Sequence, residues 1–183
     1  VQHLVVGHDH RFGNKRGGGY NELQDVAQAY GFSVEQVAAL NYEQFQVSST
    51  QVRKALEFGD LDLASEFLGH PYTVQGVVHP GEKIGRSIGF PTANLHVSPH
   101  KLLPADGVYM VQARVENRWY PAMANIGHRP TVSETTERRF EIHILNFSGD
   151  LYGKEVLVTF QKKIRDERKF ENLNALKFQF DKY

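Results

Sequence analysis

The sequence predicts an α+β chain with part of a parallel α/β sheet over residues 1–69 and an antiparallel β-structure, a barrel or a sandwich, over residues 70–183. Two observations carry this prediction. Strand-like and helix-like segments alternate in the first part, which is typical of parallel sheets. After Pro71, short strand-like runs follow one another without helices between them, which favours antiparallel pairing. We place the boundary at residues 69–71.

In the first part, strands are expected at residues 3–6 and 34–40, on either side of a helix at residues 20–30. Leu23, Val26, Ala27 and Tyr30 recur at helical spacing in this segment. Two further helices are expected, one that begins after the capping residues 48–50 and runs to Phe58, and one at residues 61–68. Because two strands cannot complete a parallel sheet and no Met precedes the apolar run 1–6, the chain is expected to begin inside a domain.

In the second part, apolar alternation between turn residues predicts five strands, at residues 72–79, 108–115, 119–125, 139–146 and 155–160. Residues 116–118 are expected to form a hairpin tip. The spacing of Leu173, Leu176 and Phe180 predicts a helix that ends the chain.

The composition excludes several classes of protein. The chain has 21 basic and 21 acidic side chains, so no global positive field is available to bind nucleic acid. It contains no cysteine, which excludes disulfides and thiolate metal sites and is compatible with a cytoplasmic location. No apolar run approaches the length of a membrane span. We therefore expect neither nucleic-acid nor membrane partners.

The most informative segment is the glycine-containing stretch of residues 81–94. Its glycines are Gly81, Gly85 and Gly89. Glycine lets the backbone approach an anion closely, and Lys83 and Arg86 add positive charge. Thr92 and Asn94 offer the hard oxygen ligands that suit Mg²⁺. The spacing matches neither a Walker A loop nor G-x-G-x-x-G, so the residues alone leave open a phosphate site or a flexible connection.

Residues 85–94, residues 141–147 with 149–153, and residues 164–167 with 169–170 resemble, in this order, the motifs of riboflavin kinase. Together they cover roughly residues 70–183. The resemblance implies an antiparallel barrel that uses ATP and Mg²⁺ to convert riboflavin into FMN.

The resemblance also implies roles for particular residues. Glu141 falls on the catalytic base, although alternation alone also allows a solvated outer face for it. Thr92 and Asn94 fall on the residues that hold Mg²⁺. The residues expected to bind ATP are Gly81, Lys83, Gly85, Arg86, Gly89, Pro91, Thr92, Asn94 and Tyr152. Those expected to bind the flavin are Asn125, Arg165, Glu167 and Phe170.

The first part resembles the second half of a Rossmann-like FMN adenylyltransferase domain, as found in the bacterial bifunctional riboflavin kinase/FAD synthetase family. The residues that match its motifs are Gly7, Ser48, Ser49, Thr50 and Arg53. The chain departs from this family in two ways. His10 stands where Phe is usual, and the strand with the H-x-G-H motif is missing. FAD synthesis is therefore expected of the full-length protein and not of this chain.

Three other functions stay open at this point. The protein could act mainly as an FMN adenylyltransferase, bind flavin without turnover, or be a nucleic-acid-binding barrel. The last needs basic and aromatic residues interleaved on one sheet face, and the sequence shows no such pattern. The expected partners are small molecules, and the sequence predicts no oligomeric state.

Overall fold

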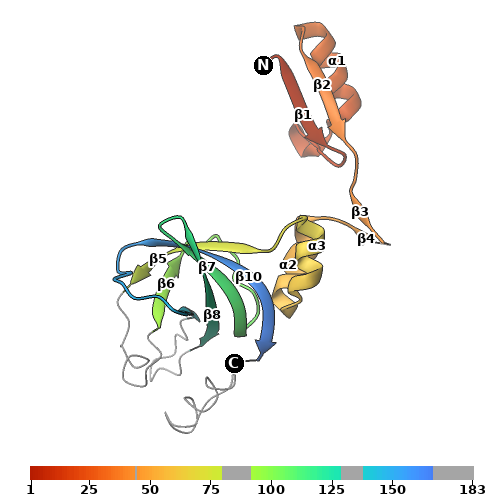
Figure 1. Cartoon of the computed structure of the whole chain (residues 1–183). Helices are drawn as coiled ribbons and strands as arrows, with labels where there is room; N and C mark the ends of the chain where they lie inside the picture. The colour runs from red at the N-terminus through yellow and green to blue at the C-terminus, as the bar shows by residue number, and fades with distance from the viewer. Residues whose placement is uncertain (44, 80–91, 129–137, 167–183) are drawn as a thin grey trace. The chain divides into compact units, whose positions relative to one another are not determined.

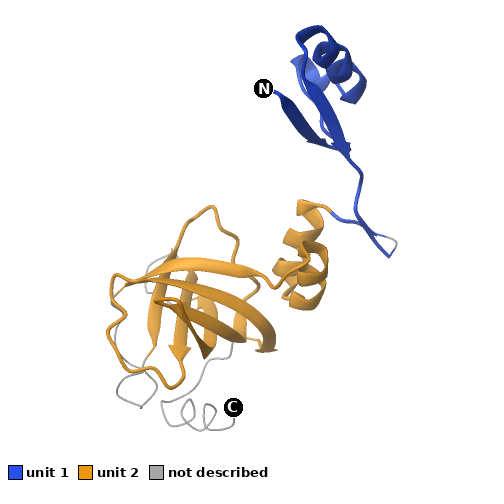
Figure 2. Cartoon of the chain, turned by 45° about the horizontal axis from the view of Figure 1, so that its top comes forward, with its two compact units in different colours: residues 1–47 blue, residues 48–183 orange. Residues whose placement is uncertain are grey.

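The computed structural model describes residues 1–43, 45–79, 92–128 and 138–166 (Figure 1). The chain divides into two compact units, Val1–Val47 and Ser48–Tyr183 (Figure 2). Within the part that the structure describes, none of the helices combines the length and hydropathy needed for a transmembrane segment.

The first unit is built around two parallel strands, β1 (His3–Gly7) and β2 (Ser33–Val37). The chain between them forms a short 3₁₀ turn, η1 (Asn14–Arg16), and the helix α1 (Tyr20–Tyr30). This confirms the predicted strand–helix–strand order, although β2 ends at Val37 and not at residue 40. Two short antiparallel strands follow, β3 (Asn41–Tyr42) and β4 (Phe45–Gln46).

The second unit begins with the helices α2 (Ser49–Phe58) and α3 (Leu61–Leu68). Both end where predicted, and α2 begins within the predicted capping residues 48–50. Ser48 caps α2, since its Oγ accepts the N–H of Gln51 at 3.4 Å. The helices belong with the barrel because their buried residues Ala55, Leu56, Leu61 and Ala64 join its core. The predicted boundary at residues 69–71 separates two sequence patterns, whereas packing places the break in the structure before Ser48.

The rest of the second unit is a closed barrel of antiparallel strands in the order β10-β5-β6-β9-β8-β7. The strands are β5 (Thr73–His79), β6 (Ala93–Val97), β7 (Gly107–Val115), β8 (Arg118–His128), β9 (Arg138–Ile144) and β10 (Glu155–Arg165). This settles the choice between barrel and sandwich. The sequence prediction did not include β6 and ended β10 five residues too early, at residue 160. The predicted helix at residues 173–183 lies outside the described residues.

Aromatic rings fill the middle of the barrel. Tyr109 and Phe160 are fully buried and meet edge to face, with ring centroids 5.3 Å apart, and Phe140 stacks on Phe160 at 5.9 Å. The hairpin between β7 and β8 turns at Glu116 and Asn117, which both have positive φ. This confirms the predicted hairpin, and a turn of this kind holds adjacent strands in fixed register.

Candidate functional site

Four of the predicted site residues lie in one row across neighbouring strands. Glu141 on β9 is paired in register with Asn94 on β6 and with Asn125 on β8. Asn125 is paired with Val108 on β7, and Val108 is paired with Arg165 on β10. Directly opposed residues have Cβ atoms about 4.5–5.5 Å apart and share one face of the sheet. The closed barrel thus brings together side chains that are far apart in the sequence.

This row lies on the outer face of the barrel. Along β9, Phe140, Ile142 and Ile144 are buried, while the alternate residues Glu141 and His143 are half-buried. The alternation predicted for this strand is therefore confirmed. A half-buried carboxylate on the outer face is reachable by a ligand and still partly shielded from water, which strengthens its electrostatic interactions.

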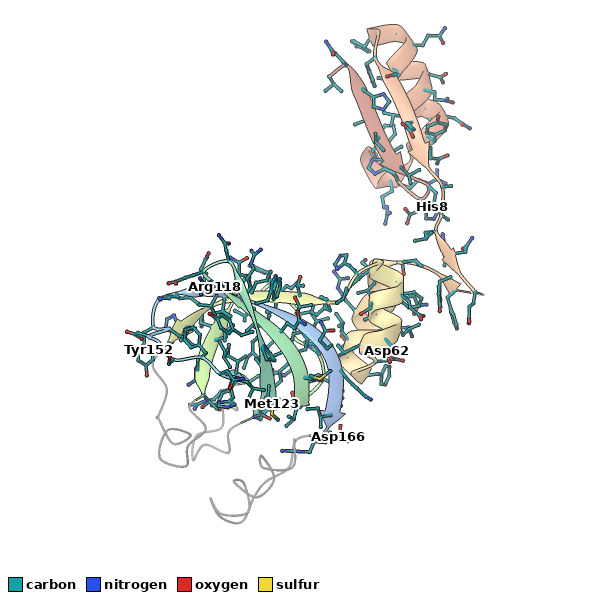
Figure 3. The ribbon with its side chains drawn as sticks, in the orientation of Figure 1. His8, Asp62, Arg118, Met123, Tyr152 and Asp166 are labelled. Atoms are coloured by element: carbon teal, nitrogen blue, oxygen red, sulfur yellow. The ribbon has the colours of Figure 1, made fainter. Side chains whose placement is uncertain are left out.

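A cavity of about 520 Å³ opens on the other side of β6 and β9. Its lining includes Thr92 and Tyr152, which were both predicted to bind ATP, together with the inward-facing Ala93 and Ile142. Tyr152 is 44% exposed and projects from the connection between β9 and β10 (Figure 3). Among the described residues, Thr92 and Tyr152 are thus grouped apart from the row that contains Glu141.

The connection that carries Tyr152 is tied to the barrel wall by its backbone. The N–H of Gly153 donates to the Val78 carbonyl at 2.9 Å, and the N–H of Val78 donates to the Lys154 carbonyl at 3.0 Å. The N–H of Tyr152 itself donates to the Asp150 carboxylate at 3.0 Å. These bonds hold the rim of the cavity in place beside β5.

Several predicted site residues lie outside the described residues. For ATP binding these are Gly81, Lys83, Gly85, Arg86, Gly89 and Pro91. For flavin binding they are Glu167 and Phe170. The prediction for each of them stands on the sequence alone.

A charged cluster that sequence reasoning missed joins the ends of β8 and β9. The Asp106 carboxylate binds Arg138 Nε at 2.7 Å and lies 3.3 Å from His128 Nε2. Arg138 also donates to the carbonyls of Leu103, at 3.3 Å, and Pro104. Because His128 and Arg138 are cross-strand partners, Asp106 fixes the same strand pair that carries Asn125 and Glu141. No local sequence motif predicts this cluster, since its members lie far apart in the sequence.

Two groups near Arg165 have shifted pKa values. Asp166 accepts a hydrogen bond from Lys163 Nζ at 2.7 Å, and this bond holds the pKa of its carboxyl below the usual value. Burial raises the pKa of Tyr109 to about 12. Arg165 Nη1 donates to the Asp166 carbonyl at 3.0 Å. The end of β10 therefore places a lysine–aspartate ion pair next to Arg165.

The residues matched to the adenylyltransferase fall in both units. Gly7 ends β1, where its carbonyl accepts the N–H of His10 at 3.1 Å. Ser48 is the cap of α2, Ser49 and Thr50 lie in its first turn, and Arg53 is exposed on the same helix. The cap explains the serine at position 48 without any ligand.

The barrel carries oxygen ligands of the kind that bind Mg²⁺ in complex with the phosphates of a nucleotide. In the described segments, no three His, Cys, Asp or Glu side chains are grouped so that they could hold a metal ion. Mg²⁺ bound with a nucleotide usually takes only one or two protein ligands, and it prefers oxygen. The Thr92 hydroxyl, the Asn94 amide oxygen and the Glu141 carboxylate are donors of this type.

Residues 68–183 match the family model described as riboflavin kinase. The chain belongs to the riboflavin kinase family. This confirms the resemblance seen in the sequence. Residues 1–51 match a second family model, described as FAD synthetase. This match agrees with a partial nucleotidyltransferase fold in the first unit.

Curated relatives match both parts. The bifunctional riboflavin kinase/FMN adenylyltransferase of Pseudomonas fluorescens is 42% identical over 97% of the chain. The protein of the same name from Escherichia coli (strain K12) is 41% identical over 98% of it. The chain spans 57% of the length of each of these relatives.

A solved structure from Streptococcus pneumoniae, described as that of a macrolide-efflux protein, is 34% identical to the chain and has a TM-score of 0.82. The match covers 98% of this chain and 58% of the chain in that structure. This description differs from the names of the curated riboflavin kinase relatives. We take from the structure the likeness in fold.

Proposed function

We propose that this chain is a riboflavin kinase, which transfers the γ-phosphoryl group of ATP to the ribityl 5′-hydroxyl of riboflavin and releases FMN and ADP. The main support is the row that holds Glu141 between Asn94 and Asn125 in a member of this family. A half-buried carboxylate flanked by two amide side chains on the outer face of the sheet can accept a proton from a bound hydroxyl.

In the proposed reaction, the bond from the ribityl oxygen to the γ-phosphorus forms as the bond from that phosphorus to the bridging oxygen of ADP breaks. Glu141 accepts the hydroxyl proton. Asn125 and Arg165 lie in the same row and would orient the flavin, with Glu167 and Phe170 proposed from the sequence for the same role. Most of the rate enhancement in such transfers comes from positioning and charge stabilisation.

The ATP would span both groups of residues, with its adenine at the cavity and its phosphates reaching the row at Asn94. Tyr152 at the rim of the cavity would pack against the adenine, and Thr92 and Asn94 would hold Mg²⁺ against the phosphates. The metal ion would supply charge neutralisation at the phosphate oxygens. Gly81, Lys83, Gly85, Arg86, Gly89 and Pro91 complete the proposed phosphate site on the basis of the sequence. A cytoplasmic location is part of the proposal, since a cysteine-free enzyme needs no oxidising compartment.

The test is FMN formation by the purified chain with riboflavin, ATP and Mg²⁺, with riboflavin, FMN and FAD separated by chromatography. In Glu141→Gln, kcat should fall by at least about 100-fold, the usual contribution of a general base. Riboflavin binding, followed by flavin fluorescence, should be retained.

Glu155→Gln is the matched control, because it removes one carboxylate from an exposed position at the start of β10. It should turn over like the unaltered chain. Retained turnover in Glu141→Gln would refute the assignment of the base. Flavin binding that is independent of Mg²⁺ and ATP, without FMN formation by the unaltered chain, would favour a flavin-binding module instead.

For the longer protein, adenylyl transfer from ATP to FMN is a second proposal. Its support is the FAD synthetase match over residues 1–51 and the bifunctional names of the relatives. Ser48, Ser49, Thr50 and Arg53 of the second unit are proposed to contribute to this activity, and Gly7 is proposed for it from the sequence alone. FAD in the chromatographic assay of the full-length protein, and its loss in Arg53→Ala, would support this proposal.

A further inference from the structure

Two histidines extend the candidate site onto a neighbouring strand. His79 ends β5 and is paired in register with Asn94, which is itself paired with Glu141. His96 lies two residues beyond Asn94 on β6, on the same outer face. The rings of His79 and His96 are tilted by 48° with centroids 5.3 Å apart. The row of the candidate site therefore continues into an imidazole pair.

Some other histidines of the chain have polar partners among the described residues. His3 contacts Ser33 and Glu35, and His128 contacts Asp106. Both His79 and His96 are exposed, and neither imidazole makes a hydrogen bond or an ion pair with another described residue. Their ring nitrogens are thus directed at no partner within residues 1–43, 45–79, 92–128 and 138–166.

We propose that His79 and His96 bind the polyphosphate chain of the nucleotide and so add a second phosphate contact beside Asn94. An imidazole N–H donates to phosphate oxygen whether the ring is neutral or protonated, and the bond is stronger with the charged ring. This inference rests on the proposed phosphoryl transfer, because it supplies the reason for a polyphosphate at this face.

Distances across the sheet agree with this role. Adjacent strands lie about 4.8 Å apart, so His79 on β5 is about 10 Å from Glu141 on β9, with Asn94 between them. A polyphosphate chain bound along the row could contact the imidazole pair at one end and present its terminal phosphorus near Asn94 and Glu141. In the sequence, His79 also stands two positions before Gly81, the first residue of the predicted phosphate segment.

The most informative variants are His79→Phe and His96→Phe. Phenylalanine keeps an aromatic ring that can pack against its neighbour and suits an exposed strand, but it removes both ring nitrogens. His79→Gln restores a single amide donor. His100→Phe is the matched control, since His100 is exposed in the connection between β6 and β7, outside the row.

Steady-state FMN formation should be measured with MgATP varied at saturating riboflavin, and then with riboflavin varied at saturating MgATP. Each His→Phe variant should raise the KM for MgATP about threefold to tenfold, as expected for one lost hydrogen bond. The kcat and the KM for riboflavin should stay within about twofold, and His79→Gln should lie between His79→Phe and the unaltered chain. An unchanged KM for MgATP in both Phe variants would overturn the proposal.

Calorimetric titration with inorganic tripolyphosphate and, separately, with adenosine tests the pair independently of turnover. Tripolyphosphate should bind more weakly to His79→Phe than to the unaltered chain, and adenosine should bind equally to both. Equal tripolyphosphate affinity, or a loss that appears only with adenosine, would contradict a phosphate contact. If the unaltered chain binds tripolyphosphate through the pair but makes no FMN, the proposed function fails while the binding site stands.

Discussion

The buried hydroxyl of Tyr109 provides a sharp test of the packing inside the barrel. Tyr109 is fully buried, its ring lies against Phe160, and its Oη donates to the Ala105 carbonyl. Tyr109→Phe keeps the ring and removes only this bond. A hydrogen bond of this kind contributes about 1 kcal/mol, and more if the carbonyl is left unsatisfied. At pH 8 the free energy of unfolding of the variant should therefore be about 1–2 kcal/mol lower than that of the unaltered chain.

The same site predicts how this difference changes with pH. Burial is the main reason that the pKa of Tyr109 rises from 10.0 to about 12, with Asp106 and Asp166 adding to the rise and Arg138 opposing it. Between pH 10 and 12 the unfolded chain ionises this tyrosine and the folded chain does not. Stability from this group is thus complete below pH 10 and is lost as the pH rises toward 12. At pH 11 the loss is about 1.4 kcal/mol.

The measurement is urea unfolding of the full chain at pH 8 and pH 11, followed by fluorescence. The chain has one tryptophan, Trp119, which lies on β8 and so reports on the barrel. The advantage of the unaltered chain over Tyr109→Phe should shrink by about 1.4 kcal/mol at pH 11. Tyr152→Phe, at an exposed tyrosine, controls for the loss of any phenol. An equal advantage at both pH values would refute the argument.

Three further predictions concern the frame of the site. Asp106→Asn weakens the hydrogen bond from Arg138 and should lower the free energy of unfolding by about 1–3 kcal/mol, measured by the same urea titration. An unchanged midpoint would show that Asp106 does not stabilise the pairing of β8 and β9. Gly107→Ala should destabilise the barrel and weaken riboflavin binding, because Gly107 has φ +155° and an added Cβ would lie 2.7 Å from the Arg165 carbonyl; unchanged riboflavin affinity would contradict the placement of Arg165. Thr92→Ala should raise the Mg²⁺ concentration needed for half-maximal FMN formation, and an unchanged Mg²⁺ dependence would remove Thr92 from the proposed metal ligands.

Local sequence was sufficient to predict most elements of the fold. The bounds of α1 and α3 were predicted to the residue, because Gly31 and Gly69 adopt the left-handed conformation that ends a helix. Strand β6 was missed because it is only five residues long and begins two residues after Pro91, so that its short alternation resembles a turn. Strand β10 was cut short because its second half passes through two irregularities in register, which interrupt the alternation.

The site was only partly accessible to sequence reasoning. The motifs singled out Glu141, Asn94, Asn125 and Arg165 one by one, and their roles remain proposals. Which of them are neighbours depends on strand register, and no single motif contains that information. Asp106 escaped notice altogether, because an aspartate between Ala105 and Gly107 looks like an ordinary turn residue until the barrel brings Arg138 beside it.

The sequence by itself determined the change from a strand–helix–strand pattern to antiparallel strands, the alternation along β9, the caps of the helices and the family of the barrel. These properties depend on residues that are neighbours in the chain, through caps, turns and periodicity. Only the tertiary structure decided that α2 and α3 pack with the barrel, that the strands close in the order β10-β5-β6-β9-β8-β7, and that the row from His79 to Arg165 crosses every strand of it. Register in a closed barrel follows from the packing of all its strands at once, and no short segment contains that constraint.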